Sequence, residues 1–102
     1  MADQQFDIAK NAKVLEELKA DLIGTVGTLL RSIVRGSQES IRGCLASIII
    51  TSYIIGRRLG LKFYQIDEAV KIQLKNSAGS EHEVEKWFSD LSSLKQYWDD
   101  MK

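Results

Sequence analysis

The chain is 102 residues long, which suits one domain over residues 1–102 with a single packed core. Its 14 basic side chains balance its 14 acidic ones, and this zero net charge argues against a dedicated nucleic-acid binder. One Cys and one His exclude an internal disulfide and a zinc cluster, and no secretory signal is visible, so we expect a cytoplasmic protein. Pro is absent, and this composition predicts an all-α fold of four helices.

The first predicted helix occupies the segment before Gly36 and is amphipathic. Its apolar residues recur at intervals of three, four and seven, which places them in one stripe facing a partner helix. The stripe consists of Ile8, Leu15, Leu18, Leu22, Val26, Leu29 and Ile33. Because Gly24 and Gly27 interrupt the pattern, the helix either packs closely against its partner there or breaks between Asp21 and Gly24.

The second predicted helix starts after Ser37, a good N-cap, and runs to about Leu59 before Gly60 ends it. Residues 43–56 within it are uncharged, a run shorter than the roughly 18 to 20 residues needed to cross a bilayer. We therefore expect no membrane association. A helix that is apolar nearly all round must be covered on every side, by other helices of the chain and by a second subunit.

Two further helices are predicted. The third runs from about Phe63 to Lys75, with its apolar residues three or four apart. The fourth begins at Ser80, because Ser80 and Glu83 have the spacing of a capping box. The predicted buried face of this fourth helix consists of Val84, Trp87, Leu91, Leu94, Trp98 and Met101.

The basic residues are unevenly distributed. Residues 31–62 carry six basic side chains and one acidic one, whereas residues 81–102 carry six acidic side chains. One interpretation is that the ends of the middle helices form ion pairs with the last helix. The other is a phosphate site at Arg57 and Arg58, because guanidinium groups match phosphate oxygens.

Five short stretches carry a resemblance to a known family. They are GRRLGL at 56–61, IDEA at 66–69, LKN at 74–76, HEVEKW at 82–87 and DLS at 90–92. In this order along the predicted helices they resemble the MazG nucleotide pyrophosphohydrolases, in particular a short MazG-like group. The resemblance implies an all-α bundle, usually a homodimer or a dimer of dimers, in which carboxylates hold Mg²⁺ on a nucleoside triphosphate.

The family pattern for the metal site is Glu-Glu-x-x-Glu on one helix and Glu-x-x-Asp on the next. Residues three or four apart share a helix face, so two facing helices can direct carboxylates at a hard cation. In this chain the positions that match these carboxylates are Gly24, Thr25, Thr28, Cys44 and Ser47. Hydroxyls and a thiol do not anchor Mg²⁺ on their own. The resemblance therefore implies a degenerate site and no metal cofactor.

A relocated metal site is the alternative. Glu17 and Asp21 lie one turn apart on one helix face, Glu16 is beside them, and Asp67 and Glu68 add carboxylates in the third helix. Mg²⁺ would then serve an active nucleoside triphosphate pyrophosphohydrolase. The facing positions on the second helix still offer no acid.

Other reactive groups are predicted to be structural. Cys44 lies in the apolar run, where a thiol is poorly reactive, and His82 is expected to be exposed at the start of the fourth helix. The aromatic residues of the last segment have helical spacing, which is typical of a core or an interface. They are Trp87, Phe88, Tyr97 and Trp98.

The sequence thus favours a degenerate MazG-like protein that acts as a nucleotide-binding or regulatory helical oligomer. Nucleotide binding should then depend on the basic ends of the second and third helices, with phosphate contacts at Arg57, Arg58, Lys71 and Lys75. Two alternatives remain at this point: an active Mg²⁺-dependent pyrophosphohydrolase, and a purely structural or protein-interaction bundle.

Overall fold

The computed structural model describes residues 2–78 and 89–101. These residues form four α-helices and no strand: α1 (Ala2–Arg35), α2 (Gln38–Arg58), α3 (Phe63–Ser77) and α5 (Asp90–Met101). The prediction of an all-α fold is confirmed. Contacts divide the chain into two compact units, residues 1–62 (unit 1) and residues 63–102 (unit 2). The predictions for Ser80, His82, Glu83, Val84, Trp87 and Phe88 lie outside the described residues.

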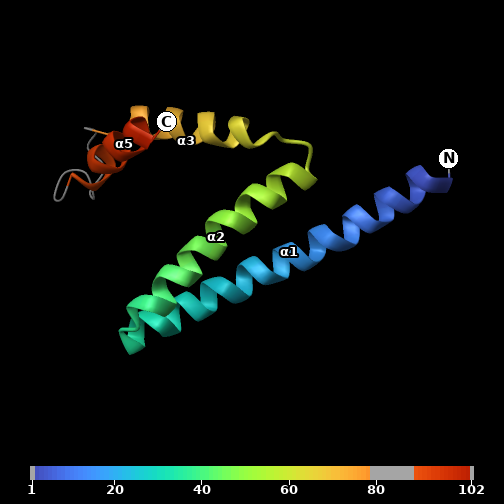
Figure 1. Cartoon of the computed structure of the whole chain (residues 1–102), viewed down its shortest axis with the longest axis horizontal. Helices are drawn as coiled ribbons and strands as arrows, with labels where there is room; N and C mark the ends of the chain where they lie inside the picture. Colours follow the sequence, from blue (N-terminus) through green and yellow to red (C-terminus); the bar gives the residue numbers. More distant parts are fainter. Residues whose placement is uncertain (1, 79–88, 102) are drawn as a thin grey trace. The chain divides into compact units, whose positions relative to one another are not determined.

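Unit 1 is an antiparallel hairpin of α1 and α2 (Figure 1). Gly36, which has a φ of 72°, ends α1, and its N–H donates to the carbonyl of Ile33 at 3.1 Å. The N–H of Ser37 donates to the carbonyl of Ser32 at 3.2 Å, and its hydroxyl accepts from the N–H of Ser40 at 3.3 Å. Ser37 is therefore the N-cap of α2, as the sequence predicts.

Helix α1 is continuous through both glycines. A Cβ placed on Gly24 would meet no atom within 4 Å, and one placed on Gly27 would meet only the Arg31 guanidinium at 3.5 Å. The glycines therefore do not mark a close approach between α1 and α2. Of the two alternatives for residues 21–24, the structure has the unbroken helix.

The seam between α1 and α2 is narrower than the predicted apolar stripe. The leucines of the stripe are half-buried, but Ile33 is 55% exposed and Ile8 and Val26 are exposed as well. Ser32 is buried in their place, with 4% of its surface exposed. A single partner helix covers only a narrow line of residues on α1. The apolar residues at the edges of a wider stripe therefore stay exposed.

Helix α2 ends as predicted at Gly60, which has a φ of 94°. The Gly60 N–H donates to the Arg57 carbonyl at 3.0 Å, and the Leu61 N–H donates to the Gly56 carbonyl at 2.9 Å. These two bonds form a Schellman motif, which satisfies carbonyls at the end of the helix.

Helix α1 alone does not provide the cover that the apolar helix α2 requires. Cys44 and Gly56 are buried, but Leu45, Ile49 and Ile50 are exposed. By length and composition, α2 is the one helix of the described chain that could cross a membrane, and 11% of its most apolar window is buried. Buried core helices of soluble proteins have the same length and composition.

Unit 2 is a pair formed by α3 and α5. Leu74, in the last turn of α3, is buried, and Ile66 and Val70 are half-buried, in line with the predicted apolar spacing of the third helix. The prediction that one helix runs through residue 89 is wrong, because Ser89 has a φ of 56° and lies outside α5. A positive φ is incompatible with a continuing right-handed helix, so α5 begins at Asp90.

Candidate functional site

A small hollow opens on the hairpin of unit 1, where residues of α1 face residues of α2. It has a volume of about 360 Å³ and is lined by Thr25, Thr28, Ser40, Gly43, Cys44 and Ser47. We call it the hydroxyl hollow. Four of the five positions that we predicted to match the family's carboxylates, namely Thr25, Thr28, Cys44 and Ser47, line this hollow, and Gly24 does not. The two predicted boxes therefore meet at one place in the fold.

Hydroxyl hydrogen bonds link the two helices beside the hollow. The Ser32 hydroxyl donates its proton to the Thr28 carbonyl at 2.8 Å and lies 2.6 Å from the Ser40 hydroxyl. Since a hydroxyl has only one proton, Ser40 must be the donor in the contact between the two serines. No sequence pattern predicts this role for Ser32, because serine is neither apolar nor acidic and so belongs neither to the apolar stripe nor to the carboxylate pattern.

The hollow does not fit Mg²⁺. Its lining has hydroxyls and one thiol but no carboxylate, whereas Mg²⁺ sites in proteins use carboxylates. A guanidinium nitrogen of Arg31 donates to the Thr28 hydroxyl at 3.1 Å, so a positive charge already lies beside one of the matched positions. A second cation there would be repelled.

The relocated site finds no support from side-chain contacts. Glu16 pairs with Lys19 at 2.8 Å, and both side chains are exposed. Glu17 and Asp21 are exposed on α1 as well. Among the described residues, no group of three or more His, Cys, Asp or Glu side chains comes together where it could hold a metal.

Arg57 and Arg58 lie at the C-terminal end of α2, in a pocket of about 420 Å³ that Asn11 and Ile54 also line. The Asn11 amide donates to the Arg58 carbonyl at 3.1 Å, and the Arg58 guanidinium donates to the Asn11 side-chain oxygen at 3.4 Å. Asn11 thus connects this end of α2 to α1, a role that no sequence pattern predicted. The negative end of the α2 helix dipole also lies at this pocket, and it weakens the attraction of Arg57 and Arg58 for a phosphate group.

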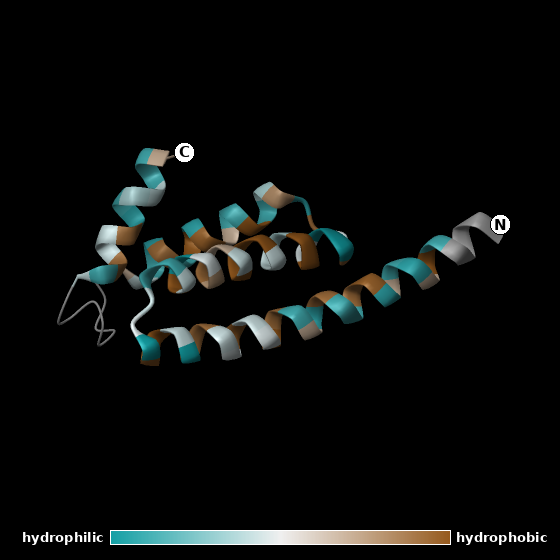
Figure 2. Ribbon diagram, turned by 60° about the horizontal axis from the view of Figure 1, so that its bottom comes forward, coloured by the Kyte–Doolittle hydropathy of each residue, from teal (hydrophilic) through white to brown (hydrophobic). Residues whose placement is uncertain are grey.

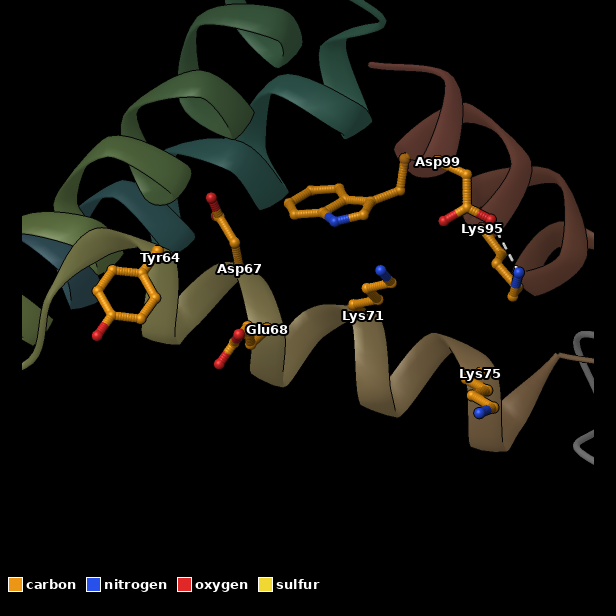
Figure 3. A pocket seen from close by; sticks show the side chains of 8 residues that line it. Tyr64, Asp67, Glu68, Lys71, Lys75, Lys95 and Asp99 are labelled. Atoms are coloured by element: carbon orange, nitrogen blue, oxygen red, sulfur yellow. Dashed lines mark hydrogen bonds and ion pairs between the residues drawn. The ribbon is translucent and has the colours of Figure 1, made fainter. Parts of the chain in front are cut away.

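Lys71 and Lys75 line a different cavity, which lies within unit 2 and has a volume of about 680 Å³ (Figure 3). Its lining comes from α3 and α5: Tyr64, Asp67, Glu68, Lys71, Lys75, Lys95, Trp98 and Asp99. Lys95 and Trp98 belong to α5, and the spacing of residues in the sequence did not predict that they would lie beside α3 in this cavity. The cavity combines an indole ring with three ammonium groups and three carboxylates.

The Lys95 ammonium binds the Asp99 carboxylate at 2.8 Å within this cavity. That hydrogen bond lowers the pKa of Asp99 below its ordinary value, and the charges of Lys95 and Lys71 act in the same direction. Lys71 and Lys75 form no ion pair with a residue that the structure describes. The four predicted phosphate contacts therefore divide between a pocket of unit 1 and a cavity of unit 2.

Comparison with known proteins places both the hydroxyl hollow and the lysines of α3 within one family match. The family model described as the MazG-like family matches residues 8–91, which is most of the chain. No curated protein and no solved structure matches. The match includes the α1 and α2 residues that surround the hydroxyl hollow and the α3 residues that line the cavity of unit 2. The chain belongs to the MazG-like family.

Proposed function

We propose that this MazG-like protein binds nucleotides without hydrolysing them and acts as a regulatory helical oligomer in the cytoplasm, without a membrane. The observation that carries the proposal is the hydroxyl hollow, where four positions matched to carboxylates meet and none is acidic. The Arg31 guanidinium beside Thr28 adds to the argument, because it disfavours a dication. The family membership supports nucleotides as the ligand class.

The cavity of unit 2 is the better candidate for the nucleotide. Trp98 offers an aromatic face for a base, and Lys71 and Lys75 have ammonium groups available for phosphates. The pocket at Arg57 and Arg58 has no aromatic side chain in its lining. We therefore assign Lys71 and Lys75 the larger share of phosphate binding.

The catalytic part of the proposal is tested by measuring pyrophosphate release from a panel of common and damaged nucleoside triphosphates, with Mg²⁺ and with Mn²⁺. An active MazG enzyme serves as the positive control. We expect no turnover above background. Turnover that disappears in Glu17→Gln or Asp21→Asn would overturn the proposal and establish the relocated metal site.

The binding part is tested by calorimetric titration of the same nucleotides without a divalent cation. The double variant Lys71→Ala/Lys75→Ala should weaken binding at least tenfold, because it removes two positive charges from the cavity. The matched control, Arg57→Ala/Arg58→Ala, removes the same charge from the pocket of unit 1 and should have a smaller effect. The reverse order would move the phosphate site to the end of α2, and no binding by the wild type would refute the proposal.

A further inference from the structure

The cavity of unit 2 is acidic toward the start of α3 and basic toward its end. Hydrophilic and hydrophobic segments alternate along this helix (Figure 2), and its charged residues in the cavity change from acids to lysines. At a rise of about 1.5 Å per residue, Lys71 lies about 6 Å and Lys75 about 12 Å beyond Asp67 along the helix axis. Carboxylates repel phosphates, so a ligand that is only a phosphate does not account for the acidic end.

The two acids of this end, Asp67 and Glu68, differ in direction and burial. Figure 3 shows the side chains of Asp67 and Lys71 on the side of α3 that faces α5, whereas Glu68 points away from it. Asp67 is half-buried and Glu68 is exposed. Trp98, which α5 contributes to the same cavity, is half-buried as well. A ligand that stacks on the indole ring inside the cavity therefore meets the Asp67 carboxylate.

We propose that this cavity selects guanine nucleotides and that the Asp67 carboxylate accepts two N–H groups of the guanine base. Trp98 stacks on the base, and Lys71 and Lys75 bind the phosphates at the basic end. This inference names the class of nucleotide in the proposed function and rests on it.

The choice of guanine follows from the chemistry of a carboxylate. An ionised carboxylate only accepts hydrogen bonds, and its two oxygens match two parallel N–H donors. Guanine presents such a pair on one edge, from N1 and the 2-amino group. Adenine and cytosine present one amino group beside a ring nitrogen that only accepts, and uracil presents one N–H between two carbonyl oxygens. These arrangements place an acceptor against the carboxylate, which repels it.

Asp67 can bind the base and keep a contact within the chain. Its two oxygens have about four acceptor sites, and guanine needs only part of them. Its half-buried position lowers the local dielectric constant, which strengthens a hydrogen bond to a charged group. Lys95 is already held by Asp99 at 2.8 Å, so the lysines left for the phosphates are the two that lie farther along α3.

Calorimetric titration with GTP, ITP and ATP, without a divalent cation, tests the base preference. ITP differs from GTP only by the missing 2-amino group, so the wild type should bind GTP at least tenfold more tightly than ITP or ATP. Asp67→Asn should bind GTP and ITP equally, because an amide has one acceptor oxygen instead of two. Glu68→Gln is the matched control, since it removes the same charge from the neighbouring position and should keep the preference.

Circular dichroism and the affinity for ITP show whether Asp67→Asn is folded, since the loss of a negative charge should not weaken phosphate binding. Equal wild-type affinities for GTP and ITP would overturn the inference and leave nucleotide binding intact, as would a preference that survives in Asp67→Asn. No binding of any nucleotide would refute the proposed function together with the inference. A requirement for Mg²⁺ in GTP binding would also overturn it, because the carboxylates would then be ligands of the cation.

Discussion

Gly24 is a residue that destabilises its helix although no close packing requires a glycine there. It lies in the interior of α1, where Gly costs about 1 kcal/mol relative to Ala, and its missing Cβ would meet nothing within 4 Å. Nothing in the hairpin therefore requires Gly at this position. The residue matters only because it stands at one of the positions that match the family's carboxylates.

Gly24→Ala should raise the free energy of unfolding by about 0.5–1 kcal/mol, because Ala restricts the unfolded chain and favours the helix. Urea unfolding followed by circular dichroism measures the change. Gly36→Ala is the control, since its φ of 72° strains any residue with a Cβ and should lower stability. A loss of stability in Gly24→Ala would mean that the helix needs Gly there.

Asp99 is the residue whose titration depends on one identified partner. Lys95→Met should raise the pKa of Asp99 toward its ordinary value, because it removes the hydrogen bond from the ammonium group. Lys71→Met should raise it less, since Lys71 acts only through its charge. Carboxyl-carbon NMR titration of both variants measures the two shifts.

The lowered pKa has a consequence for stability. A carboxyl group with a lower pKa in the folded chain stabilises it above the ordinary pKa of Asp. That contribution is lost as the pH falls through the lowered value, and it is small because Asp99 is exposed. The stability difference between the wild type and Lys95→Met should therefore shrink at acid pH. A difference that grows with acid would show that Lys95 acts elsewhere.

At the scale of the elements, α1 and α2 bring together four of the positions that the resemblance matches to the family's metal-binding carboxylates. The hydroxyl hollow contains Thr25, Thr28, Cys44 and Ser47, two from each helix. Because the register of the hairpin is set by the turn at Gly36 and by the contact between Ser32 and Ser40, these positions still face one another. Acidic side chains at these four positions should therefore give the hollow affinity for Mg²⁺.

A variant with Thr25→Glu, Thr28→Glu, Cys44→Glu and Ser47→Asp should bind Mg²⁺ measurably by calorimetry, with the wild type as the non-binding reference. The matched control carries Gln at the first three positions and Asn at the fourth. It has nearly the same shape without the charge, so it should not bind. A folded carboxylate variant without Mg²⁺ affinity would contradict the assignment of the hollow to the family's metal boxes.

At the scale of the whole molecule, the proposed oligomer links stability to concentration. Burial of the exposed apolar residues of α2, such as Ile49, would stabilise the folded state only when copies of the chain meet, so the melting temperature of the wild type should rise with protein concentration. Ile49→Glu should show no such dependence. Melting curves over a hundredfold range of concentration measure both, and a flat wild-type curve would argue for a monomer.

The local pattern of the sequence determined the helices and their ends. The absence of Pro, the periodic apolar residues, Ser37 as an N-cap and Gly60 as a C-terminal stop act within a few residues, and the structure has α2 between them. The same local rules failed at Ser89: a capping box and apolar spacing predicted a helix through this residue, but Ser89 has a positive φ and lies outside α5. The spacing of apolar residues indicates which segments favour a helix, but it does not show at which residue the helix must end.

Only the tertiary structure decided which face of each helix is used. Ile33 and Ser32 are neighbours, and the packing of α2 buries the serine and exposes the isoleucine. The same packing gathers Thr25 and Ser47 at one hollow, and the pairing of α3 with α5 joins Lys71 to Trp98 in one cavity. Contacts between residues far apart in the chain depend on helix rotation and register, which no single helix determines by itself.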